Sequence, residues 1–264
     1  MKCWFITGVS SGIGAALAKA VLDRGDMVIG TVRRRDALAA FEAQAPGRAH
    51  GLMLDLDEPG QISPAVEEAI GKAGRIDVVV NNAGRSVFGA VEETDREEAL
   101  GLYKTNVLGP MGVMQAFLPH FRANGGGTFV NLSSGCGLFG VPGVGAYCAS
   151  KFALEGLSET LAQEVAPFNV KVMIVEPGAV SGQFISHGTT ESANRMTEYD
   201  FLTGNGKALF DPFYENFADS PETVAQSIIS ALESEEVPLR LVVGGSVKEG
   251  AKAKGEAFLA LGEA

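Results

Sequence analysis

The sequence predicts a single doubly wound α/β domain, with a seven-stranded, mostly parallel sheet and helices on both of its faces. Short apolar runs recur along the chain, and the better ones are continuously apolar, as in strands that are covered on both faces. The segments between them carry apolar residues at helical spacing. This alternation implies parallel strands joined by right-handed crossovers. Because one α/β domain often fills about 250 residues, we expect residues 1–264 to form one domain.

The expected strands and helices follow one another from the first residues onward. The strands are predicted at 3–6, 27–29, 52–54, 76–80, 128–132, 170–175 and 239–243. The first helix has one apolar stripe and ends near Gly25, a residue suited to a left-handed helix cap. Its stripe comprises Ile13, Ala16, Leu17, Ala20 and Val21, and a later helix has one of Ala153, Leu157, Leu161 and Val165.

Two segments interrupt the alternation. Residues 181–220 are rich in aromatic side chains and poor in regular pattern, and a loop of that length inside a compact domain usually has a function. We expect this segment to form a substrate lid. Residues 245–264 are rich in Ala, Lys, Glu and Gly, which predicts a peripheral tail.

Composition and charge exclude several classes of protein. With 46% hydrophobic and 20% charged residues, the chain is neither disordered nor collagen-like. A formal net charge of −11 argues against nucleic acid or an anionic membrane as a partner. No apolar stretch approaches the roughly 20 residues of a membrane helix, and no export signal precedes the first strand. Three cysteines and scattered histidines match no metal site, so we expect no metal, free thiols and a cytoplasmic location.

A glycine-rich turn joins the first strand to the first helix and reads Thr-Gly-Val-Ser-Ser-Gly-Ile-Gly over residues 7–14. Glycines let backbone N–H groups approach a phosphate closely, and the positive end of the helix adds to the attraction. The spacing differs from the general G-x-G-x-x-G pattern, so an ordinary turn is the alternative. Its place between strand and helix favours a dinucleotide, contacted by Gly8, Ser10, Ser11, Gly12, Ile13 and Gly14.

The end of the second strand indicates which dinucleotide is bound. A carboxylate there would bind a ribose 2′-hydroxyl, whereas an arginine accommodates a 2′-phosphate. This chain has three successive arginines and no carboxylate at that turn. Arg33 and Arg34 can bind phosphate through charge-assisted hydrogen bonds, whereas Arg35 fits the solvated start of a helix. The sequence therefore favours NADP(H) over NAD.

Tyr147 and Lys151 are four residues apart on a predicted helix, so their side chains share one face. A phenol has an ordinary pKa of about 10, and a neighbouring ammonium stabilises the phenolate. Such pairs also arise by chance on helix surfaces. Ser133 and Ser134 end the preceding strand, where a hydroxyl can hold a substrate oxygen.

In combination, these residues resemble the classical short-chain dehydrogenase/reductase family. The resemblance extends from Thr7 to about Val243 and implies a Rossmann-type fold. Its motifs occur in the family's order: the turn at 7–14, the Asn-Asn-Ala-Gly run at 81–84, Asn106, the serine pair at 133–134, Tyr147 with Lys151, and Pro177 with Gly178.

The resemblance implies a role for each polar residue. Tyr147 would donate a proton to the carbonyl oxygen in reduction and accept it in oxidation. Ser134, rather than Ser133, would hydrogen-bond the same oxygen. Lys151 would lower the pKa of Tyr147 and hold the nicotinamide ribose, and Asn106 would retain a water that links Lys151 to solvent.

The resemblance also implies the remaining cofactor contacts. Asp55 would bind the adenine amine and Leu56 would line the ring, while Asn82 and Gly84 would border the adenine ribose. Further contacts are expected from Ala83, Tyr147, Lys151, Pro177, Gly178 and Val180. The chain departs from the family at Gly182, where a threonine often meets the nicotinamide carboxamide. Ser181 or the backbone of Val180 would have to substitute for it.

The expected function is transfer of hydride between NADP(H) and a carbonyl or secondary alcohol. A hydrophobic substrate is expected beneath the lid, against Ser134, Leu138, Phe139, Val144, Tyr147 and Phe184. Simple packing of the lid on the core is the alternative to such a pocket. A non-catalytic NADP-binding sensor, and dehydration or epimerisation by the same residues, are alternative functions. The resemblance further implies a homodimer or homotetramer.

Overall fold

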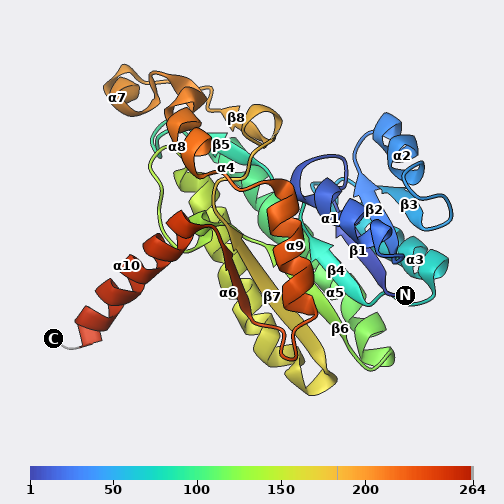
Figure 1. The fold of residues 1–264 in the computed structure, drawn as a ribbon. Coiled ribbons are helices and arrows are strands. Elements are labelled where there is room, and N and C mark those ends of the chain that lie inside the picture. Colours follow the sequence, from blue (N-terminus) through green and yellow to red (C-terminus); the bar gives the residue numbers. More distant parts are fainter. Residues whose placement is uncertain (183, 263–264) are drawn as a thin grey trace.

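The computed structural model describes residues 1–182 and 184–262. Within them, seven strands form one sheet, in the order β3-β2-β1-β4-β6-β7-β9 (Figure 1), and every neighbouring pair is parallel. The strands are β1 Cys3–Thr7, β2 Met27–Val32, β3 Ala49–Met53, β4 Val78–Asn81, β6 Gly127–Leu132, β7 Val170–Pro177 and β9 Arg240–Val243. The predicted doubly wound α/β fold is confirmed, and the sheet is parallel throughout.

The strands differ from their predicted bounds by one to three residues, and β2 ends at Val32 rather than Ile29. β3 begins at Ala49 rather than Leu52 because Ala49, His50 and Gly51 pair in register with Val28, Ile29 and Gly30 of β2. This segment lacks the β-branched pattern on which the prediction rested. β4 begins at Val78 rather than Ile76.

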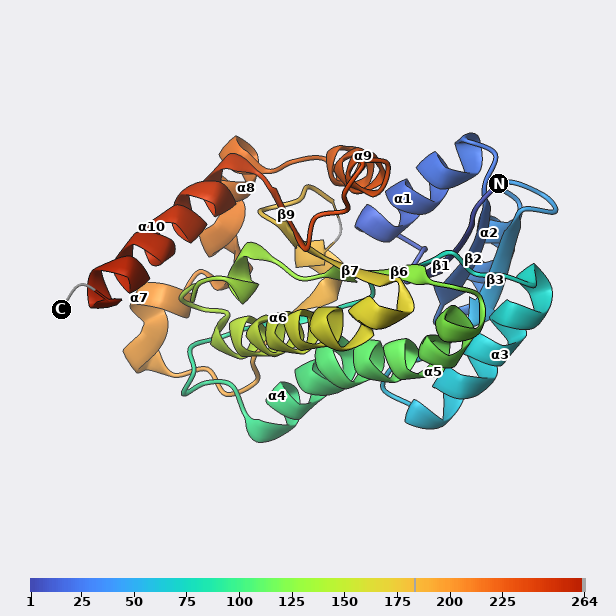
Figure 2. The same cartoon turned by 90° about the horizontal axis from the view of Figure 1, so that it is seen from below.

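Helices cover both faces of the sheet, as Figure 2 shows from below. One face is covered by α1 Gly12–Asp23, α2 Arg35–Glu42 and α9 Pro221–Leu232. The other face is covered by α3 Ile62–Ala73, α5 Gly109–Ala123 and α6 Gly145–Val165. Because the strands are buried on both sides, their apolar residues need not alternate with polar ones.

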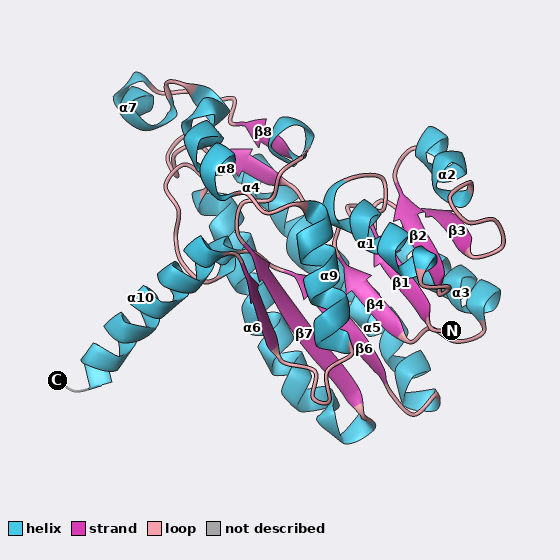
Figure 3. Cartoon of the chain, viewed as in Figure 1, coloured by secondary structure: helices cyan, strands magenta, loops and turns pink. Residues whose placement is uncertain are grey.

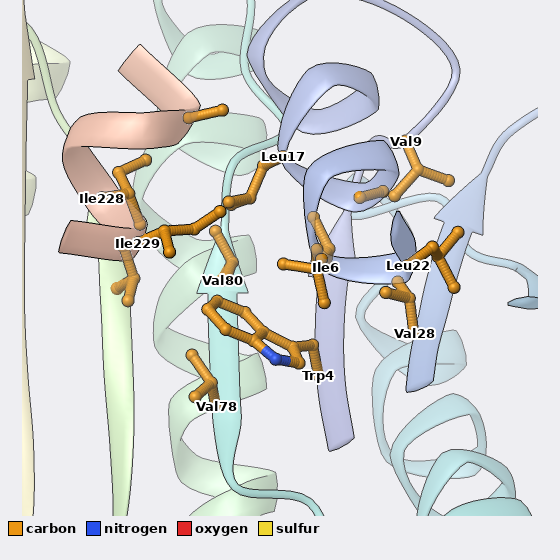
Figure 4. Packing of buried hydrophobic residues seen from close by; sticks show 14 of the residues in the cluster. Trp4, Ile6, Val9, Leu17, Leu22, Val28, Val78, Val80, Ile228 and Ile229 are labelled. Carbon is orange, nitrogen blue, oxygen red and sulfur yellow. The ribbon is translucent and has the colours of Figure 1, made fainter. Parts of the chain in front are cut away.

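Successive side chains of β1 enter opposite halves of the core. Trp4 and Ile6 pack with Leu17 of α1 and Ile228 of α9 (Figure 4). Phe5, between them, points to the other face, where its ring centroid lies 4.9 Å from that of Phe117. Full burial of one such side chain contributes about 1.5–3 kcal/mol. The two clusters therefore hold the strand from both sides and fix where its carboxyl end lies.

The carboxyl ends of the strands meet at one edge of the sheet. From β1 the chain order runs outward through β2 and β3 on one side, and through β4, β6, β7 and β9 on the other. The direction of winding therefore reverses between β1 and β4, and a crevice opens outside the strand ends at such a switch point. The glycine-rich turn leaves β1 at this position.

The segment 181–220 contains short elements that the sequence did not predict. Strand β8 Thr189–Glu191 pairs in parallel with β5 Ser86–Phe88 to form a small second sheet. Short helices α7 Asp200–Thr203 and α8 Asp211–Phe217 follow. Figure 3 shows these elements gathered at one end of the large sheet. Three-residue strands are too short to leave a readable hydrophobic pattern.

Helix α10 Gly245–Gly262 projects from the body of the molecule (Figure 1). Phe258, Leu259 and Leu261 near its end are exposed, whereas Val247 in its first turn is buried. Among the described helices, none combines the length and apolar character needed to traverse a bilayer.

Candidate active site

A cavity of about 850 Å³ lies at the carboxyl edge of the sheet. Most of the predicted site residues line it, although they come from segments far apart in the sequence. From the described part of the chain, the predicted residues in its wall are Gly8, Ser10, Ser11, Gly12, Ile13, Arg33, Arg34, Asp55, Leu56, Asn82, Ala83, Gly84, Ser134, Phe139, Val144, Tyr147, Lys151, Pro177, Gly178, Val180 and Phe184. Gly14, Asn106 and Leu138 are not among the lining residues.

Backbone hydrogen bonds hold the glycine-rich turn against the end of β2. Gly8 has a φ of +75°, a conformation that favours glycine, and the N–H groups of Gly8 and Val9 both donate to the carbonyl of Thr31 at 3.1 Å. Gly14, predicted to contact the cofactor, does not line the cavity. A Cβ on it would lie 2.3 Å from both Asn82 Nδ2 and the Gly8 carbonyl oxygen, so this glycine lets α1 pack closely against the turn.

The N-terminus of α1 fits an anion. Ser11 at the N-cap makes no side-chain capping hydrogen bond, and the first turn has no acidic residue. The first N–H groups of a helix have no intrahelical acceptor, and the helix dipole favours negative charge there. Gly12 opens onto free space, since a Cβ on it would meet no atom within 4 Å. These features match a pyrophosphate-binding turn.

Two arginines at the end of β2 border the same cavity, but they differ in their partners. Arg34 forms an exposed ion pair with Asp36, through a hydrogen bond of 3.1 Å from Nε among others. This carboxylate raises the pKa of Arg34, and the arginine lowers the pKa of Asp36. No carboxylate in residues 1–182 or 184–262 pairs with Arg33. Arg33 is therefore the better placed of the two to bind an anionic ligand.

Asn82 holds the turn in place. Its Nδ2 donates to the carbonyls of Thr7 at 2.8 Å and Gly8 at 3.1 Å, and its own N–H donates to Thr7 Oγ1 at 3.0 Å. Asn81 is buried within the sheet and donates to Asn131 Oδ1 at 2.8 Å. Both asparagines therefore tie strands together, in addition to any contact that Asn82 makes in the cavity.

Asp55 and Leu56 follow β3 and form the far wall. An Asp55 carboxylate oxygen accepts a hydrogen bond of 3.1 Å from the N–H of Asp57. Leu56 is buried against Gly109 at the start of α5, where a Cβ would lie 2.8 Å from that of Leu56. The two residues are thus fixed where an adenine ring was expected.

Tyr147 and Lys151 lie at the start of α6, and both are buried. Lys151 Nζ is 5.7 Å from the centroid of the Tyr147 ring and donates to the Leu132 carbonyl at 2.7 Å. Burial lowers the pKa of Lys151 to about 8, opposed by the negative charge of Glu155. These contacts fix the lysine at the back of the cavity.

The hydroxyl of Tyr147 is less acidic than the sequence led us to expect. Burial is the largest influence and raises its pKa, the nearby Cys136 thiol raises it further, and a hydrogen bond with Ser134 lowers it. The predicted acidifying effect of Lys151 does not prevail here, because desolvation of the phenol outweighs it and the ammonium is directed to a carbonyl. At neutral pH the phenol keeps its proton.

Asn106 lies in a π-helical turn, Lys104–Leu108, between α4 Arg96–Tyr103 and α5. Such turns occur frequently at functional sites. Its Oδ1 accepts from the N–H of Arg85 at 3.0 Å, and its Nδ2 donates to the Arg85 carbonyl at 2.9 Å and to Ser150 Oγ at 3.0 Å. A Cβ on Gly84 would lie 3.3 Å from Asn106 Oδ1 and 3.7 Å from Lys151 Nζ. The asparagine is thus behind the cavity wall and next to the lysine.

The cavity continues beyond Tyr147 into an apolar region. Phe184 of the 181–220 segment has its ring centroid 6.1 Å from that of Tyr147. Leu138, predicted to line this region, is not among its lining residues, and its carbonyl accepts a hydrogen bond from Lys254 Nζ at 2.5 Å. Cys136, Phe210 and Tyr214 also line it, although none of them was among the predicted substrate contacts. Their place in a segment rich in aromatic residues was the available signal for the last two.

Packing of the lid on the core, the alternative reading of these aromatics, also occurs. Phe210 meets Phe88 edge-on at 5.4 Å between ring centroids while lining the cavity. Among the described residues, no group of three His, Cys, Asp or Glu side chains could hold a metal ion.

Comparison with known proteins matches this arrangement to a family. Residues 2–192 match the model of the short chain dehydrogenase family. The chain belongs to this family. A short-chain dehydrogenase from Streptomyces avermitilis is 40% identical, with a TM-score of 0.91 over 98% of this chain and 94% of that one. Its members are oxidoreductases that act on alcohol and keto groups of small molecules.

This short-chain dehydrogenase also has curated relatives. The 3-ketodihydrosphingosine reductase of Bacteroides thetaiotaomicron is 34% identical over 92% of this chain and 88% of that protein. Human 17-beta-hydroxysteroid dehydrogenase type 1 is 34% identical over 89% of this chain and 75% of that protein.

More distant structures carry either dinucleotide. An alcohol dehydrogenase from Thermococcus sibiricus, 25% identical with a TM-score of 0.75 over 92% and 96% of the chains, is complexed with 5-hydroxy-NADP. A short chain dehydrogenase/reductase from Burkholderia phymatum is complexed with NAD. It is 20% identical, with a TM-score of 0.85 over 98% of this chain and 95% of that one.

Proposed function

We propose that this short-chain dehydrogenase interconverts a hydrophobic ketone and its secondary alcohol with NADP(H), using Tyr147 as the proton donor and acceptor. The observation that carries the proposal is that one cavity is lined at one end by the glycine-rich turn and Arg33, and at the other by Ser134, Tyr147 and Lys151. A non-catalytic sensor needs only the first of these groups.

The cavity residues suit reduction at neutral pH. Burial keeps the Tyr147 hydroxyl protonated, so it can give its proton to a carbonyl oxygen, while Ser134 donates a hydrogen bond to the same oxygen. A bound nicotinamide supplies the hydride. Lys151 maintains positive charge behind the phenol, which favours the phenolate that remains after proton transfer.

Arg33 supports the preference for NADP(H). It faces the cavity without a carboxylate partner among the described residues, whereas the charge of Arg34 is compensated by Asp36. We therefore assign recognition of a 2′-phosphate mainly to Arg33, with Arg34 in a secondary role.

The hydrophobic substrate is supported by the apolar region beyond Tyr147, which includes Phe139, Val141, Val144, Phe184 and Phe210. Concave apolar sites with a few converging polar groups bind ligands of matching character. Two relatives are named as a 3-ketodihydrosphingosine reductase and a 17-beta-hydroxysteroid dehydrogenase. Both kinds of compound carry a keto or hydroxyl group on a large apolar skeleton.

The test is consumption of NADPH, followed by nicotinamide absorbance, with a panel that compares bulky apolar ketones with small polar ones. We expect the bulky apolar ketones to be reduced faster. Tyr147→Phe should lower turnover by about 100-fold or more while NADPH binding, measured by fluorescence, is retained. Unchanged turnover in this variant would refute the mechanism. Product formation without a change in nicotinamide absorbance would instead indicate dehydration or epimerisation.

A further inference from the structure

A partly buried group of charges lies next to Lys151 along α6. Arg240, the first residue of β9, bonds to three carboxylates: Glu155 and Glu159 on α6, and Glu176 on β7. Its Nη1 is 2.7 Å from Glu155 Oε2. The side chains of Glu155 and Glu176 are 7% and 0% exposed, whereas that of Glu159 is 46% exposed. One guanidinium thus faces more negative charge than it can neutralise.

The second carboxylate oxygen of Glu155 faces the strand that carries the site. A Cβ on Gly137 would lie 2.5 Å from Ser133 Oγ and 2.9 Å from Glu155 Oε1, so only glycine leaves room for the two groups to approach. Both atoms are buried, and neither has a hydrogen-bond partner among the described residues. Burial raises the pKa of Glu155, and the nearby Ser133 hydroxyl and Arg240 oppose this rise only in part.

Ser133 connects this group to the site through the backbone. The residue before it, Leu132, accepts the hydrogen bond of Lys151 Nζ at 2.7 Å, and the residue after it, Ser134, hydrogen-bonds the phenol of Tyr147. Glu155 is also one helical turn beyond Lys151, so the two side chains are neighbours on one face of α6.

We propose that Glu155, fixed by Arg240 and lying beside Ser133, is a positioning residue that keeps Lys151 protonated and directed at the Leu132 carbonyl. The inference rests on the proposed function in that it explains how the lysine stays charged where burial would neutralise it. A buried ammonium without a counter-charge loses its proton readily. Glu155 supplies that counter-charge, and Arg240 holds it in one place.

Other groups around the two side chains do not replace Glu155. Lys151 also faces Tyr147 on α6, Cys136 on the 3₁₀ turn Gly135–Gly137, and the neutral Asn106 beside Gly84. Of these, Cys136 keeps its proton because a hydrogen bond with Cys148 and burial raise its pKa. Glu155 in turn faces Arg240, Glu159 and Glu176.

Glu159 gives a matched control, because it too is an acid on α6 that bonds to Arg240. The experiment is an NMR titration of the Lys151 side chain in lysine-labelled protein, with the signal assigned through Lys151→Arg. Glu155→Gln should lower the pKa of Lys151 by about one unit or more, and Glu159→Gln should change it much less. An equal effect of the two variants, or none in either, would overturn the proposal.

The reciprocal measurement does not depend on the folding of Glu155→Gln. If the two groups interact, Lys151→Met must raise the pKa of Glu155, which carboxyl-labelled NMR reports. An unchanged pKa of Glu155 would count against the proposal.

These titrations need no substrate, so they remain informative if no ketone is reduced. Where a bulky ketone from the panel is reduced, the rate of its reduction should fall as pH rises and Lys151 loses its proton. This fall should begin at a lower pH in Glu155→Gln than in Glu159→Gln. Failure of Tyr147→Phe to affect turnover would remove the proposed function, yet it would leave the coupling between Glu155 and Lys151 measurable.

Discussion

At Tyr147, burial and hydrogen bonding act in opposite directions on one hydroxyl. Burial raises its pKa and the bond with Ser134 lowers it. The sequence predicted that these residues would meet, because their spacing follows a known family pattern. It could not predict the balance between them, since desolvation depends on what the lid, Phe184 included, places over the ring.

Arg33 provides a test at the same scale. Arg33→Ala should weaken NADPH binding more than tenfold, because a hydrogen bond to a charged group contributes about 1.5–3 kcal/mol. Binding of NADH should change little. Arg35→Ala is the control, since Arg35 begins α2 and does not line the cavity among the described residues. Fluorescence titration gives the dissociation constants of both coenzymes. An equal loss of affinity for NADPH and NADH in Arg33→Ala would disprove the assignment of Arg33 to the 2′-phosphate.

At the scale of elements, replacing a glycine by alanine should have opposite effects on stability in α1 and in α3. Gly14→Ala should destabilise the protein by about 1–3 kcal/mol, because its Cβ would lie 2.3 Å from Asn82 Nδ2 and the Gly8 carbonyl oxygen. Gly71→Ala in α3 meets no atom within 4 Å and should stabilise by about 0.5–1 kcal/mol through helix propensity. Urea unfolding measures both. A Gly14→Ala protein as stable as the parent would contradict the close packing described here.

The lid elements are anchored to the body by one buried carboxylate, Glu93, which is 0% exposed. It accepts hydrogen bonds from the N–H of Met196 at 2.9 Å and from Thr203 Oγ1 at 3.1 Å. These bonds lower the pKa of Glu93 against the opposing effect of burial. The anchor joins residues about a hundred positions apart, so no local pattern in the sequence could reveal it.

Removing this anchor should loosen the lid. Glu93→Gln leaves buried donors without an ionised acceptor, which should cost about 1–3 kcal/mol and speed proteolytic cleavage within residues 181–220. Glu92→Gln is the neighbouring control, since Glu92 bonds Tyr199 at the surface and should change stability by less than about 0.5 kcal/mol. Equal cleavage rates in the two variants would show that Glu93 does not hold the lid.

At the scale of the whole molecule, the sheet was predictable and the links across it were not. Continuous apolar runs and helical stripes gave all seven strands of the sheet in the described residues, because local pattern determines which segments are buried. The cluster around Arg240 joins β7, β9 and α6. Its charges look like ordinary surface residues until the chain is folded, and the same is true of the small sheet of β5 and β8.

That cluster makes global stability depend on pH. Burial and neighbouring carboxylates raise the pKa of Glu176 to about 7 from its ordinary 4.5. The folded protein thus binds this proton more tightly than the unfolded chain does, and the free energy of unfolding should fall as pH rises between these values, by up to about 1.4 kcal/mol per pH unit.

Glu176→Gln should remove most of this dependence, so that the variant gains stability relative to the parent at pH 8 but not at pH 4. Thermal unfolding across this range measures the difference, with Glu159→Gln as the control for an exposed partner of Arg240. Parallel curves for parent and Glu176→Gln would show that another group titrates.

Through Val247, helix α10 lines the cavity described above. It is buried in the first turn of α10, lines the cavity, and a Cβ on Gly178 would lie 3.1 Å from its Cγ2. Helix α10 therefore forms part of the cavity wall in its first turn, whereas its C-terminal residues are exposed. A fusion partner added at the carboxyl terminus should leave coenzyme affinity intact, whereas deletion from residue 245 onward would open the cavity to water on that side.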